Sequence, residues 1–460
     1  MVLGTPTAYG HDGPGRRAAP NRPGIGPGDV RAVLERHMLV DGYDLVLDLN
    51  ASFGVWLVDA LTGERYLDLF SFFASSPLGF NSVHMVGDRE FLDELAVAAL
   101  HKPSNPDVYT VPYARFVHTF AEVLGDPLLP YLHFVEGGAL AVENALKAAF
   151  DWKAQKLGLP DDAVDGLQVL HLERSFHGRS GYTLSLTNTE PAKTLRFPKF
   201  AWPRIPSPAL RHPLAEHESA NRDAERRSLA AAEAAFAAAD GMIACFIAEP
   251  IQGEGGDNHL GAGFLQAVQR LCHDNDALFV LDEVQTGCGI TGTPWAYQQL
   301  GLRPDLVAFG KKTQVCGVMG GGRIDEVPNH VFAVPSRISS TWGGNLVDMV
   351  RATRVLETVE RLRLLDAVAR GGQHLLDGLV ALAAAHPGVV RNPRGRGLMC
   401  AIDLPDTATR DDVLTRMYRD HRVIALPCGE RGLRFRPPLT ITEDELDLGL
   451  DALANVVGAL

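Results

Sequence analysis

Five short apolar runs, separated by segments with helical spacing, constrain the fold of this chain more than any other feature. They are YLHFV (131–135), LQVLHL (167–172), MIACFIA (242–248), ALFVL (277–281) and LVAF (306–309). Strands that are apolar on both faces are typical of a parallel sheet covered by helices on both sides. Between the runs, ALAVENALKAAFDWKAQ and GFLQAVQRLC place apolar residues three and four positions apart, which indicates helices. We therefore predict an α/β protein with a mostly parallel sheet.

The segments on either side of this sheet predict a second, smaller domain. At 460 residues the chain is long enough for two domains. Residues 1–27 are rich in Gly, Pro and Arg and contain almost no large apolar residue, so we expect a disordered tail. Past residue 345 the sequence predicts one long helix over LVDMVRATRVLETVERLRLL (346–365). Short strands predicted in residues 28–75 and 345–460 indicate one small α+β domain built from both segments. The large domain is then predicted to span residues 76–344.

Composition argues against two classes of partner. The chain has 43 basic and 56 acidic residues, a formal net charge of −13, whereas nucleic-acid-binding proteins concentrate Lys and Arg on one face. The sequence shows no apolar stretch long enough to cross a bilayer and no signal-peptide core, so we expect no membrane partner. The six cysteines are scattered without a CxxC pair, which favours reduced thiols, a cytoplasmic protein and no metal site.

Each predicted strand is followed by chemically active residues. The segments are EGG, ERSFHGR, EPIQGEGG, DEVQTG and GKK, in chain order. Open α/β sheets bind ligands beyond the carboxyl ends of their strands, so we expect these segments to meet in one crevice.

Asp282 and Lys311 indicate what this crevice binds. Asp282 ends an apolar run, and a buried carboxylate needs a partner. It either binds local backbone amides, pairs with Lys311, or shares a ligand with Lys311. Pyridoxal phosphate has matching needs, because it takes an amine at its aldehyde, a carboxylate at its pyridinium nitrogen and a dipole-rich pocket at its phosphate. Gly137 and Gly138, before a predicted helix, supply such a pocket without the pattern of a P-loop.

Longer motifs resemble the class III, or omega, aminotransferases. They are AEPIQGEGG, LDEVQTGCGITGTPWAYQQLGLRPDLVAFGKK and LRFRPPLTI, and the resemblance extends from about residue 28 to the C-terminus. It implies the pyridoxal phosphate fold type I of aspartate aminotransferase and an obligate homodimer with shared active sites. KPSNPDVYTV, HGRSGYTLSLTNT and STWGGNLVDMVRA are similar, more narrowly, to the actinobacterial branch of the family that acts on the 6-amino group of L-lysine.

The resemblance implies roles for residues around the cofactor. Lys311 would form the Schiff base and move the catalytic proton. Lys312 would face away from the cofactor, because neighbours on an extended segment point to opposite sides, and would lie on a solvent-exposed face as most lysines do. The other implied contacts are Asp282 at the pyridinium nitrogen, Gln285 at the ring hydroxyl, Phe176 and Val284 on the ring faces, Gly138 and Ala139 at the phosphate, and Thr341 at the phosphate of the partner subunit.

Two arginines would hold the carboxylates of the substrates, since guanidinium binds a carboxylate bidentately. The resemblance implies Arg179 for the α-carboxylate of L-lysine and the γ-carboxylate of 2-oxoglutarate, and Arg434 for the α-carboxylate of 2-oxoglutarate or L-glutamate. Glu254 would pair with Arg434 during the lysine half-reaction and swing aside afterwards. Alternatively, Arg436 is the pocket residue and Arg434 is structural, because we expect only one of the two to face inward. Glu254 is alternatively a turn cap.

The resemblance implies transfer of the 6-amino group of L-lysine to 2-oxoglutarate. The products would be L-glutamate and 2-aminoadipate 6-semialdehyde, which cyclises to 1-piperideine 6-carboxylate. One alternative is another omega-aminotransferase, acting on ornithine, 4-aminobutyrate or a diamine, because pocket shape rather than a motif selects the chain length. The other is a non-catalytic regulatory module that binds pyridoxal phosphate, against which the intact Lys311, Asp282, Arg179 and Arg434 argue.

Overall fold

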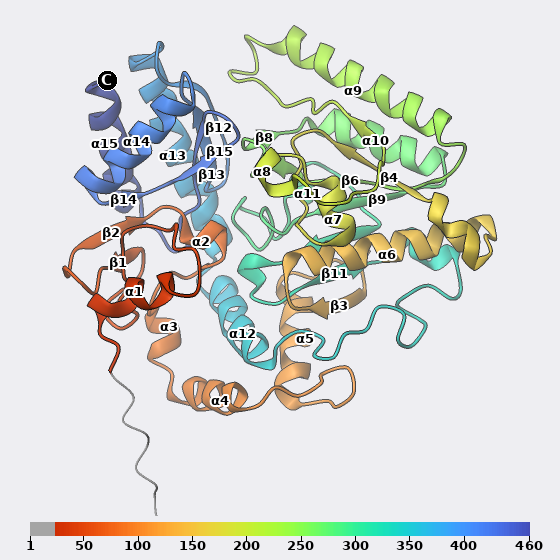
Figure 1. Ribbon diagram of the computed structural model, residues 1–460, viewed down its shortest axis with the longest axis horizontal. Coiled ribbons are helices and arrows are strands. Elements are labelled where there is room, and N and C mark those ends of the chain that lie inside the picture. Colours follow the sequence, from red (N-terminus) through yellow and green to blue (C-terminus); the bar gives the residue numbers. More distant parts are fainter. Residues whose placement is uncertain (1–23) are drawn as a thin grey trace, which may run out of the picture.

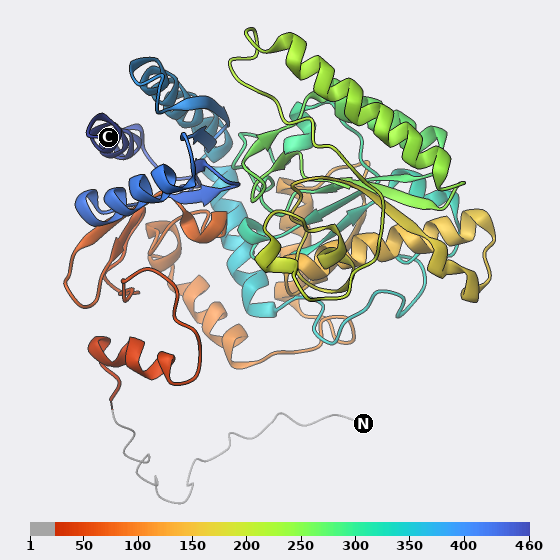
Figure 2. The ribbon, with the colours of Figure 1, turned by 45° about the horizontal axis from the view of Figure 1, so that its top comes forward.

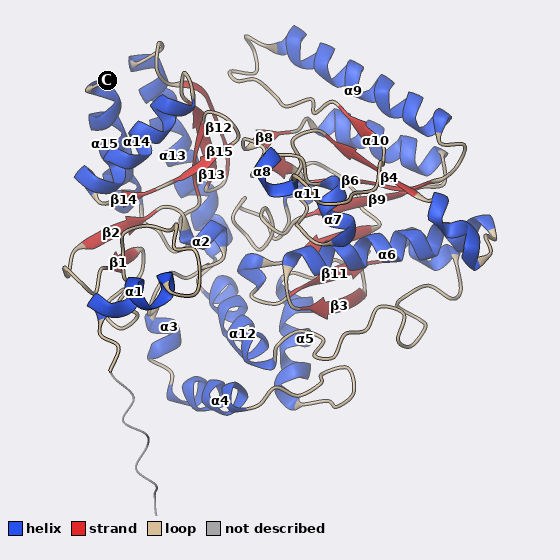
Figure 3. Cartoon of the chain, in the orientation of Figure 1, coloured by secondary structure: helices blue, strands red, loops and turns tan. Residues whose placement is uncertain are grey.

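The computed structural model describes residues 24–460. Of the predicted tail, residues 1–23 lie outside the described residues, and Pro27 already begins a short 3-10 helix (Pro27–Asp29) that leads into α1 (Val30–Glu35). A larger body around a seven-stranded sheet lies beside a smaller body that holds two further sheets (Figure 1, Figure 3).

The seven-stranded sheet contains all five predicted strands. In spatial order it consists of β3 (Tyr131–Val135), β11 (Cys316–Gly320), β10 (Leu306–Phe309), β9 (Leu278–Asp282), β6 (Ile243–Ala248), β4 (Gln168–Leu172) and β5 (Arg204–Ile205). Only β11 runs against its neighbours, so the sheet is mixed but mostly parallel, as predicted. The sequence gives little signal for β11, which is rich in glycine, or for β5, which has two residues.

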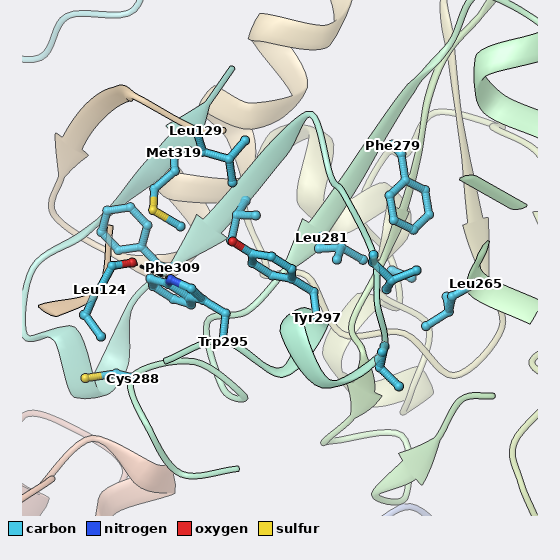
Figure 4. Packing of buried hydrophobic residues seen from close by; sticks show 14 of the residues in the cluster. Leu124, Leu129, Leu265, Phe279, Leu281, Cys288, Trp295, Tyr297, Phe309 and Met319 are labelled. Carbon is cyan, nitrogen blue, oxygen red and sulfur yellow. Dashed lines mark hydrogen bonds between the residues drawn. The ribbon is translucent and has the colours of Figure 1, made fainter. Parts of the chain in front are cut away.

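Strand β9 shows why these runs are apolar throughout. Leu278 and Val280 pack on the face covered by α6 (Gly138–Leu157). Phe279 and Leu281 pack on the opposite face, in the cluster that includes residues of α5 (Val111–Val123), α10 (Ala262–Asp274) and α12 (Leu346–Arg361). Figure 4 shows part of this second cluster, where Trp295 Nε1 donates a hydrogen bond to the carbonyl oxygen of Leu124 at 2.6 Å. Burial on both faces removes the alternation that an exposed strand would show.

Most predicted helices are present, and one is divided. The other helices include α3 (Val83–Val86), α4 (Arg89–Leu100), α7 (Gly181–Leu186), α8 (Pro191–Thr194), α9 (Glu218–Ala238), α11 (Ala296–Gln299), α13 (Leu364–Ala385), α14 (Thr407–His421) and α15 (Glu443–Gly458). The predicted long helix around residues 346–365 is wrong in its length, because Arg363 has a φ of 50° and separates α12 from α13. Among residues 24–460 no helix is both long and apolar enough to cross a membrane.

The smaller body joins the two ends of the chain. Strand β14 (Val423–Ile424) pairs in parallel with β2 (Arg65–Asp68), so segments more than 350 residues apart share one sheet (Figure 2). This sheet has the order β1 (Trp56–Val58), β2 (Arg65–Asp68), β14 (Val423–Ile424), and the second has the order β12 (Arg391–Arg396), β13 (Met399–Asp403), β16 (Gly432–Phe435), β15 (Leu426–Cys428). The domain boundaries at residues 75 and 344 stay a prediction.

Candidate active site

The loops that follow the parallel strands meet at one edge of the large sheet. A Cβ atom on Gly138, after β3, would lie 3.1 Å from Val284 Cγ1, after β9. A Cβ atom on Gly310, after β10, would lie 3.4 Å from the same methyl group. Val284 therefore holds the start of α6 next to the segment that carries Lys311, and the predicted convergence of these loops is confirmed.

The backbone around Lys311 is strained. A Cβ atom at Gly310 would lie 2.9 Å from Cys316 Sγ, so only glycine fits there without movement. Lys311 has a φ of 56°, which is uncommon for a residue with a side chain and is often found at functional sites. Burial lowers the pKa of the Lys311 amine, Arg434 and Arg436 lower it further, and Glu254 and Asp282 oppose the shift. A lowered pKa raises the fraction of the nucleophilic, unprotonated amine.

The partner of Asp282 is a histidine that the sequence analysis did not assign. Asp282 is 5% exposed, and its Oδ2 lies 2.8 Å from His177 Nδ1. Its Oδ1 accepts a hydrogen bond from the Val284 amide. The suggested ion pair with Lys311 is therefore wrong. His177 follows β4, which lies two strands from β9 in the sheet. The rule that the carboxyl ends of parallel strands share one edge is the sequence signal that could have indicated this pairing.

The N-terminus of α6 leaves backbone amides open. Its N-cap, Gly137, has a φ of 109° and makes no side-chain capping bond, so the first-turn amides of Gly138 and Ala139 and the positive end of the helix dipole are available to an anion. Phe176 is half-buried, and the Lys193 ammonium lies 5.3 Å from its ring centre. Thr341 is exposed, in the loop before α12.

Arg434 and Arg436 both face inward, so the expectation that only one would do so is wrong. They are 1% and 0% exposed. Arg434 Nη1 lies 3.3 Å and Arg436 Nη2 lies 2.9 Å from Gln285 Oε1. The reason is that residues two apart on an extended chain point to the same face. Arg436 also pairs with the fully buried Asp257, and the Gln285 amide nitrogen is left as the group that can donate to a ligand.

Arg434 also pairs with Glu254, and both residues line a cavity of about 860 Å³. Its Nη2 lies 2.5 Å from Glu254 Oε1. Burial opposes ionisation of Glu254, but Arg434, with Lys193 and Lys311, lowers its pKa to about 2. Arg179 is exposed, does not line this cavity, and makes no ion pair within the described part of the chain.

Lys312 is buried, which corrects its assignment to a solvent-exposed face. The segment from Lys311 to Thr313 is a 3-10 helix rather than an extended strand, and the Lys312 side chain turns into the protein. Its Nζ donates hydrogen bonds to the carbonyl oxygens of Gln285 at 2.8 Å and Ala74 at 3.2 Å. Ala74 ends the turn α2 (Ser71–Ala74), whose four residues all have positive φ. Burial lowers the pKa of Lys312 to about 7.

Replacing Lys312 by methionine tests this burial through the pH dependence of stability. Because its folded pKa of about 7 is below the usual value of 10.5, the unfolded chain binds more protons between these values. The wild type should therefore gain stability relative to Lys312→Met as pH rises from 7 towards 10. Urea unfolding of both proteins at pH 7 and pH 9.5 measures the difference. A wild type that gains no stability relative to Lys312→Met between pH 7 and pH 9.5, or that loses some, would contradict a buried, neutral Lys312.

The family model described as aminotransferase class-III matches residues 40–457. The chain belongs to the class-III aminotransferases. This class-III aminotransferase is 74% identical over 454 residues to the L-lysine-epsilon aminotransferase of Amycolatopsis lactamdurans, covering 99% of this chain and 98% of the relative. It is 76% identical over 432 residues to that of Streptomyces clavuligerus, covering 94% of each.

Solved structures of this class agree in fold. The lysine aminotransferase of Mycobacterium tuberculosis in its internal aldimine form is 58% identical and superimposes with a TM-score of 0.91, covering 94% of this chain and 99% of that one. The ornithine aminotransferase of Toxoplasma gondii, 23% identical, shares the fold with a TM-score of 0.77. The class-III aminotransferase described here is thus an enzyme of fold type I that uses pyridoxal phosphate.

The residues present fit this cofactor. The uncapped N-terminus of α6 suits a phosphate, and the buried Asp282, held by His177, suits a protonated ring nitrogen. Lys311, with its lowered pKa, suits the aldehyde. His177 Nε2 is buried and has no hydrogen-bond partner among the described residues, so within this part of the chain the contact through Nδ1 to Asp282 is the polar contact of the ring.

Proposed function

We propose that this aminotransferase moves the 6-amino group of L-lysine to 2-oxoglutarate. The products are L-glutamate and 2-aminoadipate 6-semialdehyde, which cyclises to 1-piperideine 6-carboxylate. The observation that carries the proposal is the Glu254–Arg434 ion pair, which lines the cavity and whose charges both act on the pKa of Lys311. L-Lysine brings an amine and no carboxylate to Arg434, whereas 2-oxoglutarate brings a carboxylate. A buried arginine that meets both substrates needs a negative partner that can move away, and Glu254 can be that partner. The 74% and 76% identical relatives named L-lysine-epsilon aminotransferase support the choice of substrate.

Several residues are proposed to hold the cofactor. Asp282 would bind the ring nitrogen, Gln285 the ring hydroxyl through its amide nitrogen, and the amides of Gly138 and Ala139 the phosphate. Phe176 and Val284 would pack against the two faces of the ring. Pyridoxal phosphate supplies an electron sink that stabilises negative charge on the substrate carbon. Asp282 makes this sink effective, because its carboxylate keeps the ring nitrogen protonated.

Lys311 is proposed as the group that moves the proton. Its Nζ takes a proton from C6 of L-lysine in the first half-reaction and delivers one to C2 of the 2-oxoglutarate skeleton in the second. A base works best when its pKa is near the working pH, and burial lowers the pKa of Lys311 in this direction.

The two half-reactions differ in what Arg434 binds. When L-lysine presents its amine, no carboxylate reaches Arg434, and Glu254 neutralises it as in this structure. When 2-oxoglutarate enters, its α-carboxylate takes the place of Glu254. Arg179 is proposed to hold the far carboxylate in both cases. The exposure of Arg179 in the single chain agrees with a site that a second subunit completes. Thr341 would bind the cofactor phosphate in that second subunit.

We propose a homodimer that works in the cytoplasm. Thr341 and Trp342 are exposed in the loop before α12, where a partner subunit would cover them. Sedimentation velocity of the cofactor-loaded enzyme measures the mass. An active monomer would contradict the role of Thr341.

The function is tested by following each half-reaction separately with the wild type and Arg434→Met. The wild type should form piperideine from L-lysine and consume 2-oxoglutarate. The variant should lose about 100-fold or more in kcat/KM for 2-oxoglutarate, since truncating a buried charge partner costs about 2–5 kcal/mol. Its lysine half-reaction should stay within a few-fold. Activity of the wild type on ornithine or 4-aminobutyrate but not on L-lysine would contradict the substrate, and equal losses in both half-reactions would contradict the role of Arg434.

A further inference from the structure

Lys193 lies against Glu254 on the side away from Arg434. It belongs to α8, which lines the same cavity, and its side chain is 22% exposed. Its Nζ is 3.4 Å from Glu254 Oε2 and 2.9 Å from Oε1 of the exposed Glu190. Lys193 has no distinguishing signal in the sequence, because no motif surrounds it and its contact with Glu254 joins residues 61 positions apart.

The two oxygens of Glu254 are divided between two cations. Oε1 binds Arg434, which is 1% exposed, and Oε2 faces Lys193. Glu254 is itself only 17% exposed, so an ionised carboxylate without a partner would be costly there. Glu254 can therefore release Arg434 at low cost only if a second cation stays with it.

We propose that Lys193 is this second cation and positions Glu254 when a substrate carboxylate occupies Arg434. Glu254 then stays ionised and paired in both half-reactions and exchanges only its stronger partner. Glu190 holds the Lys193 ammonium in place, so the lysine is near Glu254 before the exchange begins. The inference rests on the proposed function and adds a specificity-determining residue to it.

Removing Lys193 should affect the two half-reactions differently. Without it, Glu254 has Arg434 as its remaining ion-pair partner and leaves it less readily, and after leaving it has no cation to receive it. Both effects weaken dicarboxylate binding, so Lys193→Met should raise KM for 2-oxoglutarate about tenfold, a size typical of coupling between neighbouring charges. The lysine half-reaction, in which Glu254 does not move, should stay within about twofold of wild type.

The experiment compares Lys193→Met, Lys193→Arg and Lys199→Met with the wild-type holoenzyme. Lys199 is a matched control, because it lies in the following loop and its Nζ donates to the backbone carbonyls of Thr194 and Phe197. Single-turnover kinetics measures each half-reaction. Calorimetry measures the affinity for glutarate, a dicarboxylate with neither an amine nor a keto group. We expect weaker glutarate binding in Lys193→Met, recovery in Lys193→Arg, and no change in Lys199→Met.

The Lys193→Met substitution in a Glu254→Ala enzyme shows whether Lys193 positions Glu254 or binds the substrate directly. In Glu254→Ala the exchange no longer occurs, so adding Lys193→Met should change glutarate affinity by less than twofold. A tenfold loss that persists in this background would mean that Lys193 binds the substrate itself and would overturn the inference. Equal losses in both half-reactions, or no loss at all, would also overturn it. A wild type inactive on L-lysine or 2-oxoglutarate would instead overturn the proposed function.

Discussion

Replacing Lys311 by alanine is expected to stop turnover while the fold is kept. We expect kcat to fall by at least about 1,000-fold, because on the proposed role of Lys311 the variant would lose both the covalent attachment of the cofactor and the amine that moves the proton. The loss of stability should be small. Lys311 has an unfavourable φ of 56°, and alanine, which also carries a Cβ atom, adds no further backbone strain there. Steady-state kinetics with L-lysine and 2-oxoglutarate measures the first effect, and circular dichroism with thermal unfolding measures the second.

Borohydride trapping followed by peptide mapping provides an independent measurement. In the wild type the reduced cofactor should be attached to Lys311, and in Lys311→Ala no attached cofactor should be found. Lys311→Arg is the matched control, because it keeps a positive charge and cannot form the same bond. Cofactor attached to Lys312, or activity that survives in Lys311→Ala, would contradict the account of the site.

Arg436→Met is expected to destabilise the enzyme by about 3–5 kcal/mol, the cost of breaking a buried ion pair. The reason is Asp257, which is 0% exposed and has Arg436 as its close cation. The second carboxylate oxygen of Asp257 has no hydrogen-bond partner among the described residues, so the charge has little other compensation. The midpoint of urea unfolding of the holoenzyme measures the loss.

Arg434→Met is the matched control for this prediction. Its partner Glu254 is partly exposed and keeps Lys193 as a second cation, and Asp257 is 3.9 Å from Arg434 Nη1. We therefore expect a loss of stability clearly smaller than that of Arg436→Met, together with the loss of the 2-oxoglutarate half-reaction. If both variants lose the same stability, the division into one substrate-binding and one structural arginine is wrong.

Most of the fold could be predicted from local pattern. Strands β3, β4, β6, β9 and β10 coincide with the apolar runs, and α6 and α10 coincide with the helical spacing. Both patterns depend only on residues that are close together in the sequence. Strand β11 could not be predicted in this way. It is a short glycine-rich segment, and what stabilises it is its pairing with β3 and β10, which are distant in the sequence.

The chemical groups that follow the strands were predictable from the sequence, but their pairing was not. The sequence by itself determined which chemical groups follow the strands, among them Lys311, Asp282 and Glu254, and the family motifs that they form. Only the tertiary structure decided that His177 pairs with Asp282 across 105 residues and that Lys312 is buried. The physical reason is that hydrogen bonds, ion pairs and burial depend on distance in space, whereas a sequence pattern reports only on neighbours along the chain.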